Sequence, residues 1–162
     1  MHPYPPRVWI SSARQTSLVG CCKYSPLIVR QAKCSPGNAP EATFANAEAL
    51  GVLDHVALHT ASFTTTLPFD DNHFALVTSS LAIHNVSAHE RKVAVAELAR
   101  ITAPGGRIII LELMGYAQGY KETLRKVCGW QDVEVSMAGA EVMFGAWPCQ
   151  VLAARKPTVA KS

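Results

Sequence analysis

Ser79, Ser80, His84 and Asn85 form a polar group at the end of a mostly apolar segment and directly after it. The segment "FALVTSS", residues 74 to 80, contains aromatic and β-branched residues and predicts a strand. Histidine, whose ordinary pKa is about 6.5, can remove a proton from a hydroxyl or an amine near neutral pH. His84 is therefore a candidate general base, and the alternative is a histidine that hydrogen-bonds only within its own loop.

The elements around this polar group predict where it lies. Strands are expected at residues 17 to 22, 55 to 59, 74 to 80, 107 to 113, 132 to 137 and 149 to 157, and helices at 27 to 33, 39 to 51, 87 to 101 and 118 to 128. This alternation favours an α/β fold, with a Rossmann-like, mostly parallel sheet, helices on both faces and an antiparallel C-terminal strand. Ligands of such sheets bind beyond the carboxyl ends of the strands, which is where residues 79 to 85 belong.

The helix expected at residues 87 to 101 carries the strongest local signals. Ser87 and Glu90 have the spacing of a capping box, and apolar residues follow at helical intervals. "PGG" at 104 to 106 then predicts a turn into "RIIILEL", whose consecutive aliphatic residues suit a strand that is covered on both faces.

Length and composition limit the class of protein. The 162 residues suit one domain at 17 to 157, after an irregular segment at 1 to 16 and before a tail at 158 to 162. The chain is 17% charged with a net charge of +3, and its basic residues are dispersed, which argues against a nucleic-acid partner. The sequence shows no secretory signal and no apolar run of about 20 residues, so we expect no membrane partner and a cytoplasmic location.

The cysteines and histidines indicate no metal site. Five cysteines occur at positions 21, 22, 34, 128 and 149, and they form no CxxC pair. No two histidines lie on one expected helix at HxxxH spacing with an adjacent acid. We therefore expect reduced, mostly buried thiols and no bound metal.

The order of motifs resembles the second half of a class I S-adenosylmethionine-dependent methyltransferase of the small-molecule type. "LPF", "FALVTSSLAIHNV" and "ELARITAPGGRIIILE" follow one another as the corresponding blocks do in that family. The earlier "PGNAPEATFANAEALGVLDHV" and the ending "WPCQVLAARKP" are similar to one of its subgroups. The resemblance covers roughly residues 17 to 157 and implies S-adenosyl-L-methionine as the cofactor and a small-molecule methyl acceptor.

The same resemblance implies a cofactor crevice at the strand ends, with His84 as the candidate catalytic base. Its cofactor-binding members are Gly20, Cys22, Ser62, Phe63, Ser79 and Ser80. Cys22 stands where the family usually has an acid that binds the ribose hydroxyls, and Ser62 stands where an acid contacts adenine. A neutral thiol cannot replace two charge-assisted hydrogen bonds, each worth about 1.5 to 3 kcal/mol. Phe63 lines the adenine pocket in the family, or else it belongs to the core.

The family's first strand and its glycine-rich GxGxG turn are not recognisable before residue 17, so we expect an N-terminally truncated domain that lacks both. Loss of that strand leaves its neighbours with unpaired backbone groups. Pairing by "RVWI", direct contact of the flanking strands, a homo-oligomer or a partner chain would fill the gap. Two hypotheses follow: methyl transfer to a small molecule, or a catalytically inactive methyltransferase-like fragment or scaffold that has lost cofactor binding.

Two other functions are disfavoured. A nicotinamide-dependent oxidoreductase requires a glycine-rich phosphate turn, which the sequence lacks. Nucleic-acid methylation usually employs an "NPPY"-type tetrad, which is replaced here by "SSLA". Trp130, Phe144 and Trp147 either belong to the core or favour an apolar or aromatic acceptor.

Overall fold

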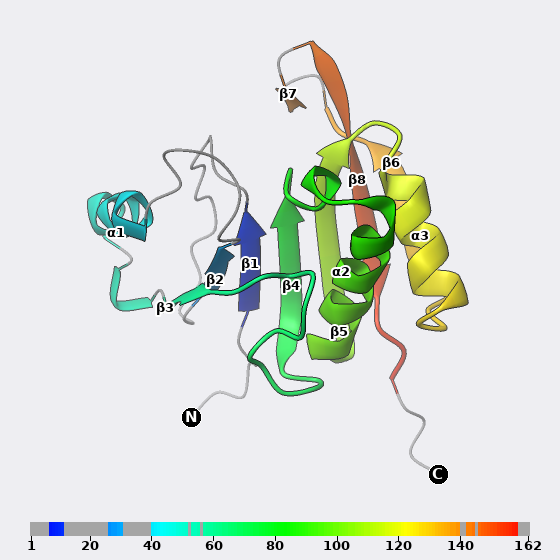
Figure 1. The fold of residues 1–162 in the computed structure, drawn as a ribbon, viewed down its shortest axis with the longest axis horizontal. Helices are drawn as coiled ribbons and strands as arrows, with labels where there is room; N and C mark the ends of the chain where they lie inside the picture. The colour runs from blue at the N-terminus through cyan, green and yellow to red at the C-terminus, as the bar shows by residue number, and fades with distance from the viewer. Residues whose placement is uncertain are drawn as a thin grey trace.

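The computed structural model describes residues 7–11, 26–30, 40–51, 53–55, 57–139, 142–144 and 146–158. Its strands are β1 (Arg7–Ser11), β2 (Pro26–Arg30), β3 (Ala57–Thr60), β4 (Phe74–Ser80), β5 (Thr102–Leu113), β6 (Val133–Met137), β7 (Met143–Phe144) and β8 (Trp147–Arg155). Its helices are α1 (Pro40–Ala49), α2 (Ala88–Ile101) and α3 (Ala117–Lys126), with short 3₁₀ turns η1 (Leu53–His55) and η2 (Ile83–Asn85). Figure 1 shows these elements arranged around one sheet.

The sheet has the strand order β3-β2-β1-β4-β5-β8-β6, and β7 pairs with β8. The five strands from β3 to β5 run parallel to their neighbours. Among the described strands, β8 alone departs from this direction, because it runs antiparallel to both β5 and β6. The expected Rossmann-like, mostly parallel sheet with an antiparallel C-terminal strand is confirmed.

The segment before residue 17 holds a central strand. β1 pairs with β2 on one side and with β4 on the other, so the position expected to be empty is occupied by "RVWIS". The expectation of a missing first strand is therefore wrong, and the expected irregular segment 1 to 16 holds a strand at its described residues 7–11. β1 begins directly after Pro6, and its Val, Trp and Ile residues have high strand propensity. Of the alternatives that would fill the gap, pairing by "RVWI" is the one observed.

β2 corrects a second expectation. The helix expected at residues 27 to 33 is a strand at Pro26–Arg30, which pairs with both β1 and β3. Three consecutive aliphatic residues follow Pro26, and such a run suits a strand between two parallel neighbours. The strand expected at residues 17 to 22 lies outside the described residues.

β4 and β5 form the middle of the sheet and were expected from their sequences. The register between them shifts after Phe74, because Thr102 pairs with Phe74 and Arg107 with Leu76. The "PGG" sequence therefore makes an irregularity within β5 instead of a turn before it. Gly105 has a φ of 75°, a conformation that glycine adopts readily.

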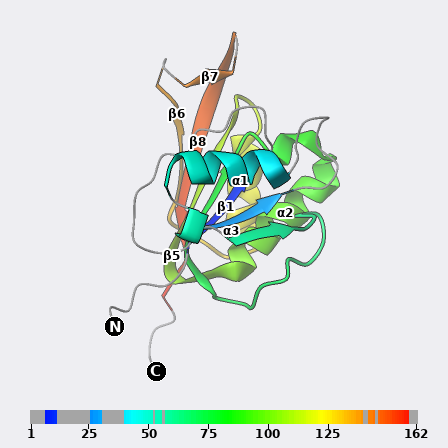
Figure 2. The ribbon, with the colours of Figure 1, turned by 90° about the vertical axis from the view of Figure 1, so that its left-hand side faces the viewer.

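The core lies between the sheet and two helices, α2 and α3, which cover the same face of it (Figure 1). Figure 2 views the molecule from the β3 side and shows α1 in front of the sheet edge, apart from α2. The largest fully buried side chains include Phe63, Phe74, Leu67, Leu98, Ile108, Ile110, Leu124 and Leu152. Trp130 also belongs to this core, whereas Trp147 is 67% exposed. Within the described part of the chain, no helix has the length and apolar character needed to cross a membrane.

Candidate functional site

The candidate site lies at the carboxyl edge of the sheet, where β4 ends beside β1 and β5. Ser80, the last residue of β4, pairs with Ser11 of β1 and with Leu111 of β5. Leu81 then turns the chain out of the sheet with a φ of 49°, while its backbone N–H still donates to the Leu111 carbonyl at 2.9 Å. This turn delivers η2, which contains His84, to the edge where ligands of such sheets bind.

Glu112 is the polar centre of this edge. It follows Leu111 in β5, and its side chain is fully buried. Its Oε1 accepts hydrogen bonds from the backbone N–H groups of Ile83 at 2.8 Å and His84 at 3.2 Å. Its Oε2 lies 2.5 Å from His84 Nδ1. One carboxylate therefore holds both the backbone of η2 and the imidazole ring.

Sequence reasoning missed Glu112, although the sequence contains a signal for it. The segment "RIIILEL" places a single acid among aliphatic residues of a strand expected to be covered on both faces. A buried carboxylate requires hydrogen-bond partners, so an acid at that position points to donors nearby. The donors come from η2, 28 and 29 residues earlier in the chain.

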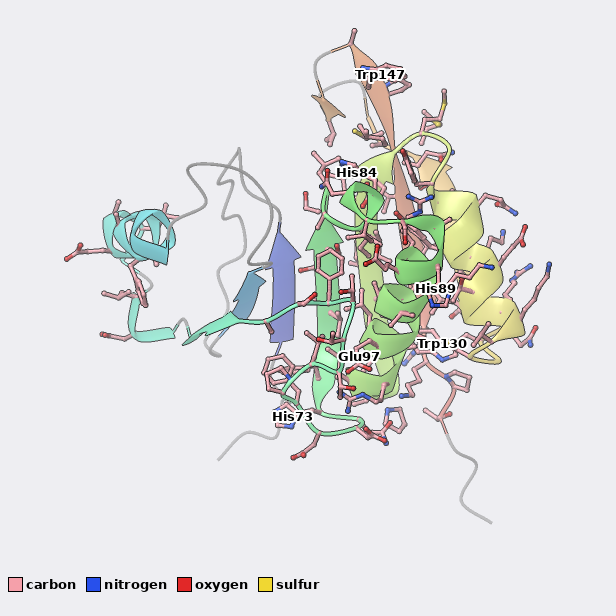
Figure 3. The ribbon with its side chains drawn as sticks, viewed as in Figure 1. His73, His84, His89, Glu97, Trp130 and Trp147 are labelled. Atoms are coloured by element: carbon pink, nitrogen blue, oxygen red, sulfur yellow. The ribbon has the colours of Figure 1, made fainter. Side chains whose placement is uncertain are left out.

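His84 lies at the top of β4 in Figure 3, on the same edge as the end of β5. Its side chain is 17% exposed, so the ring is largely enclosed but remains accessible. The Tyr116 ring lies beside it, with ring centroids 5.7 Å apart. Arg91 of α2 lies over the Tyr116 ring, with its guanidinium carbon 5.1 Å from the ring centroid. The Arg91 Nη1 also donates to the Val86 carbonyl at 2.7 Å, which holds the segment after η2.

Ser79 and Ser80 point to different environments. Ser79 is 2% exposed, and its register partner Ile110 is fully buried beneath the helices. Ser80 is only half-buried. Within the described residues, the buried hydroxyls of Ser79 and Tyr120 have no hydrogen-bond partner. Burial, and to a smaller extent the charge of Glu112, raises the pKa of the Tyr120 hydroxyl above its ordinary range.

Ser62 and Phe63 follow β3 closely. The Ser62 hydroxyl is 2.7 Å from Thr64 Oγ1 and accepts a hydrogen bond from the Thr64 backbone N–H at 3.3 Å. Phe63 is 1% exposed and belongs to the hydrophobic core, which was the alternative to a place in an adenine pocket. Gly20 and Cys22 lie outside the described residues, so the structure brings together His84, Ser79 and Ser80, with Ser62 at the end of another strand.

The loop between β3 and β4 is held to α2 by Glu97 and Arg100. Glu97 Oε1 accepts from the Leu67 backbone N–H at 2.7 Å. Arg100 Nη1 donates to the Phe69 carbonyl at 2.8 Å and to Asp71 Oδ1 at 2.6 Å. The hydrogen bond to Glu97 raises the pKa of the Arg100 guanidinium, which therefore keeps its charge. Across the described residues, His, Cys, Asp and Glu side chains form no group of three or more that could hold a metal ion.

Comparison with protein families gives a match over residues 19–110, more than half of the chain, to the methyltransferase domain. The chain belongs to the methyltransferase domain family. This methyltransferase domain is 34% identical over 106 residues to the demethylmenaquinone methyltransferase of Mycolicibacterium gilvum (strain PYR-GCK). That alignment covers 59% of this chain and 46% of the relative. The demethylmenaquinone methyltransferase of Renibacterium salmoninarum is 46% identical over 52 residues, which are 32% of this chain and 21% of that protein. The methyltransferase domain thus spans less than half the length of these relatives.

Solved structures share the fold of the methyltransferase domain. The [4+2]-cyclase SpnF has a TM-score of 0.69 at 14% identity, with 96% of this chain and 76% of that chain covered. Geranyl diphosphate methyltransferase in complex with SAM has a TM-score of 0.61 at 15% identity, with 95% and 79% covered. At these identities the likeness establishes the fold alone.

S-adenosylmethionine is the cofactor of this family, and ligands of such sheets lie at the carboxyl edge. The pairing of Ser11 with Ser80 brings the carboxyl ends of β1 and β4 side by side. Strand ends present backbone polar groups that the sheet leaves unpaired, and Ser80 adds a half-buried hydroxyl. These groups suit the hydroxyls and amino-acid part of the cofactor.

Proposed function

We propose that this methyltransferase domain transfers a methyl group from S-adenosylmethionine to a small-molecule acceptor, with His84 as the general base. The observation that carries this proposal is the position of the imidazole at the carboxyl edge, where its Nδ1 is engaged by Glu112 and its side chain is 17% exposed. The family match supports the reaction class, and the sheet topology supports the location of the site.

The domain's own residues contribute orientation and proton removal. Among the described residues, we assign Ser80 and Ser62 to cofactor binding. Gly20 and Cys22, outside the described residues, keep the same proposed role. Phe63 and Ser79 are enclosed, so we assign them to the support of that crevice from beneath. The bound cofactor supplies an electrophilic methyl group on a sulfonium. His84 accepts the acceptor's proton at Nε2, and the positive imidazolium that results is stabilised by the Glu112 carboxylate.

We further propose that the acceptor is uncharged and largely apolar. Met114 follows β5 two residues after Glu112 and is 54% exposed. Its backbone N–H donates to the Pro148 carbonyl at 2.9 Å, which places Met114 beside the start of β8. Met137 at the end of β6 is 54% exposed. Trp147 at the start of β8 is 67% exposed, and Figure 3 shows it near the upper end of the molecule. Exposed apolar residues gathered at one edge of a molecule are typical of a binding surface.

Calorimetric titration of the purified chain with S-adenosylmethionine and with S-adenosylhomocysteine tests the proposed function. Micromolar binding of both compounds supports it, and absence of heat at millimolar ligand contradicts it in favour of the inactive scaffold. Demethylmenaquinone, after which the two relatives are named, is the first acceptor to test by transfer of a labelled methyl group. A charged acceptor methylated in preference to apolar ones would contradict the acceptor class but leave methyl transfer intact.

A further inference from the structure

Within the described part of the chain, the hydrogen-bond partners of the buried Glu112 carboxylate all come from η2. Removing an ionised carboxylate from water is costly unless donors replace the lost hydration. Two backbone N–H groups, from Ile83 and His84, converge on Oε1, and the His84 ring engages Oε2. Because η2 supplies every one of these contacts, Glu112 and the His84 loop form one unit across the edge of β5.

The contacts of the two Glu112 carboxylate oxygens determine which nitrogen of the His84 ring carries the proton. A carboxylate only accepts hydrogen bonds, so the Nδ1 that lies 2.5 Å from Oε2 must carry a proton. In the neutral imidazole, the other nitrogen then has a free lone pair. The tautomer of His84 is therefore set by β5, and Nε2 is the nitrogen left to act on a ligand.

We propose that Glu112 is a positioning residue that holds His84 in the Nδ1–H tautomer and so keeps Nε2 available as the base. The catalytic part of this inference rests on the proposed function. The tautomer itself does not, because it follows from the contacts of Glu112 with η2.

The substitution Glu112→Gln tests the proposal because the amide has one acceptor and one donor in place of two acceptors. The backbone N–H groups of Ile83 and His84 are fixed donors, so the amide oxygen must occupy the position of Oε1. The amide NH₂ then faces His84 Nδ1 and donates to it. Since Nδ1 must accept, the ring proton moves to Nε2 and the lone pair of the base is lost.

Long-range ¹H–¹⁵N NMR of the histidine side chains reads the tautomer directly, and the His84→Gln spectrum assigns the His84 signals. We expect the Nδ1–H tautomer in the wild-type protein and the Nε2–H tautomer in Glu112→Gln. Glu134→Gln, in an exposed position of β6, is the matched control and should leave the His84 signals unchanged. An Nε2–H tautomer in the wild-type protein would overturn the proposal, even if Glu112→Gln failed to fold.

Kinetics separate a positioning role from a purely structural one. We expect Glu112→Gln to lower kcat by about 10² to 10⁴-fold, the range for loss of a general base, with an unchanged Kd for S-adenosylmethionine. Equal loss of cofactor binding and of kcat would show a structural role alone and would contradict positioning. If the wild-type chain binds no cofactor, the proposed function fails, while the tautomer result still decides the inference about Glu112.

Discussion

Tyr120 and His84 both feel the charge of Glu112, and the two side chains differ in how they are bonded. His84 bonds to the carboxylate and remains 17% exposed. Tyr120 is 2% exposed, and its hydroxyl has no hydrogen-bond partner within the described part of the chain. The first arrangement can act on a ligand, whereas the second only affects the stability of the fold.

Replacing His84 should lower activity by removing the proposed base. We expect His84→Gln to lower kcat by about 10² to 10⁴-fold, because proton removal from the acceptor then falls to water. His89 lies exposed in the first turn of α2, so His89→Gln is the matched control and should retain wild-type kcat. Methyl transfer measured with a labelled cofactor compares the two variants. Full activity in His84→Gln would reduce His84 to a structural histidine.

Tyr120 should make the protein less stable at alkaline pH. Its pKa is raised in the folded state, so the folded protein keeps the phenol proton while the unfolded chain loses it above pH about 10. The stability contributed by Tyr120 is complete below that pH and decreases by up to about 1.4 kcal/mol per pH unit above it. Tyr120→Phe has no proton to lose, so its free energy of unfolding should fall less steeply from pH 10 to 11. Urea unfolding at each pH measures the difference, and parallel curves for the two proteins would contradict it.

At the scale of elements, the sequence was sufficient to predict those helices and strands whose ends are marked by nearby residues. α2 begins at the Ser87 capping box, in which the Ser87 hydroxyl accepts from the Glu90 backbone and Glu90 bonds back to Ser87. β4 agrees with the segment expected at residues 74 to 80. The C-terminal end of α2 is also bonded: Lys156 Nζ donates to the Ala99 and Thr102 carbonyls, each at 2.7 Å.

Removing the cap should measure how much this helix start contributes. Ser87→Ala deletes the hydroxyl that accepts from the Glu90 N–H, and we expect a loss of about 1 kcal/mol in the free energy of unfolding. Ser87→Thr keeps a capping hydroxyl and should lose at most a few tenths of that value. Thermal and urea denaturation compare the variants. Equal stability of Ser87→Ala and the wild-type protein would mean that the cap is dispensable.

Elements that depend on distant partners were harder to predict. The sequence of β2 suits either a short helix or a strand, and the choice is made by β1 and β3, which pair with it on both sides. In the site, His84 was recognised because it follows a clear strand, whereas Glu112 was not, since its partners lie 28 and 29 residues away in the sequence. Short-range patterns do not contain that information.

At the scale of the whole molecule, β1 joins two halves of the sheet. It pairs with β2, which leads to β3, and with β4, which leads to β5 and β8. The proposed cofactor edge draws on both halves, because Ser62 follows β3 while Ser80 ends β4. Integrity of the site therefore depends on five residues near the start of the sequence.

A proline in β1 tests this dependence. Ile10 pairs with Val29 on one side and Ser79 on the other, so Ile10→Pro removes a backbone donor from the middle of the sheet. We expect a loss of about 1 to 3 kcal/mol from the carbonyl left unpaired, and faster hydrogen exchange in β2 and β3 than in β5. Ile10→Val retains the N–H and is the control. Unchanged exchange in β2 and β3 would show that the two halves do not depend on β1.

The turn at Leu81 has a consequence for the stability of the fold. A leucine with a φ of 49° costs about 1 to 2 kcal/mol relative to ordinary backbone. Domains of this kind have a net stability of about 5 to 15 kcal/mol, so this one residue uses on the order of a tenth of it. A glycine would remove the cost, but it would also free the chain between the sheet and η2. The left-handed leucine therefore lowers the stability of the fold while it fixes the angle at which the chain leaves the sheet. A protein optimised only for heat resistance would not keep this residue.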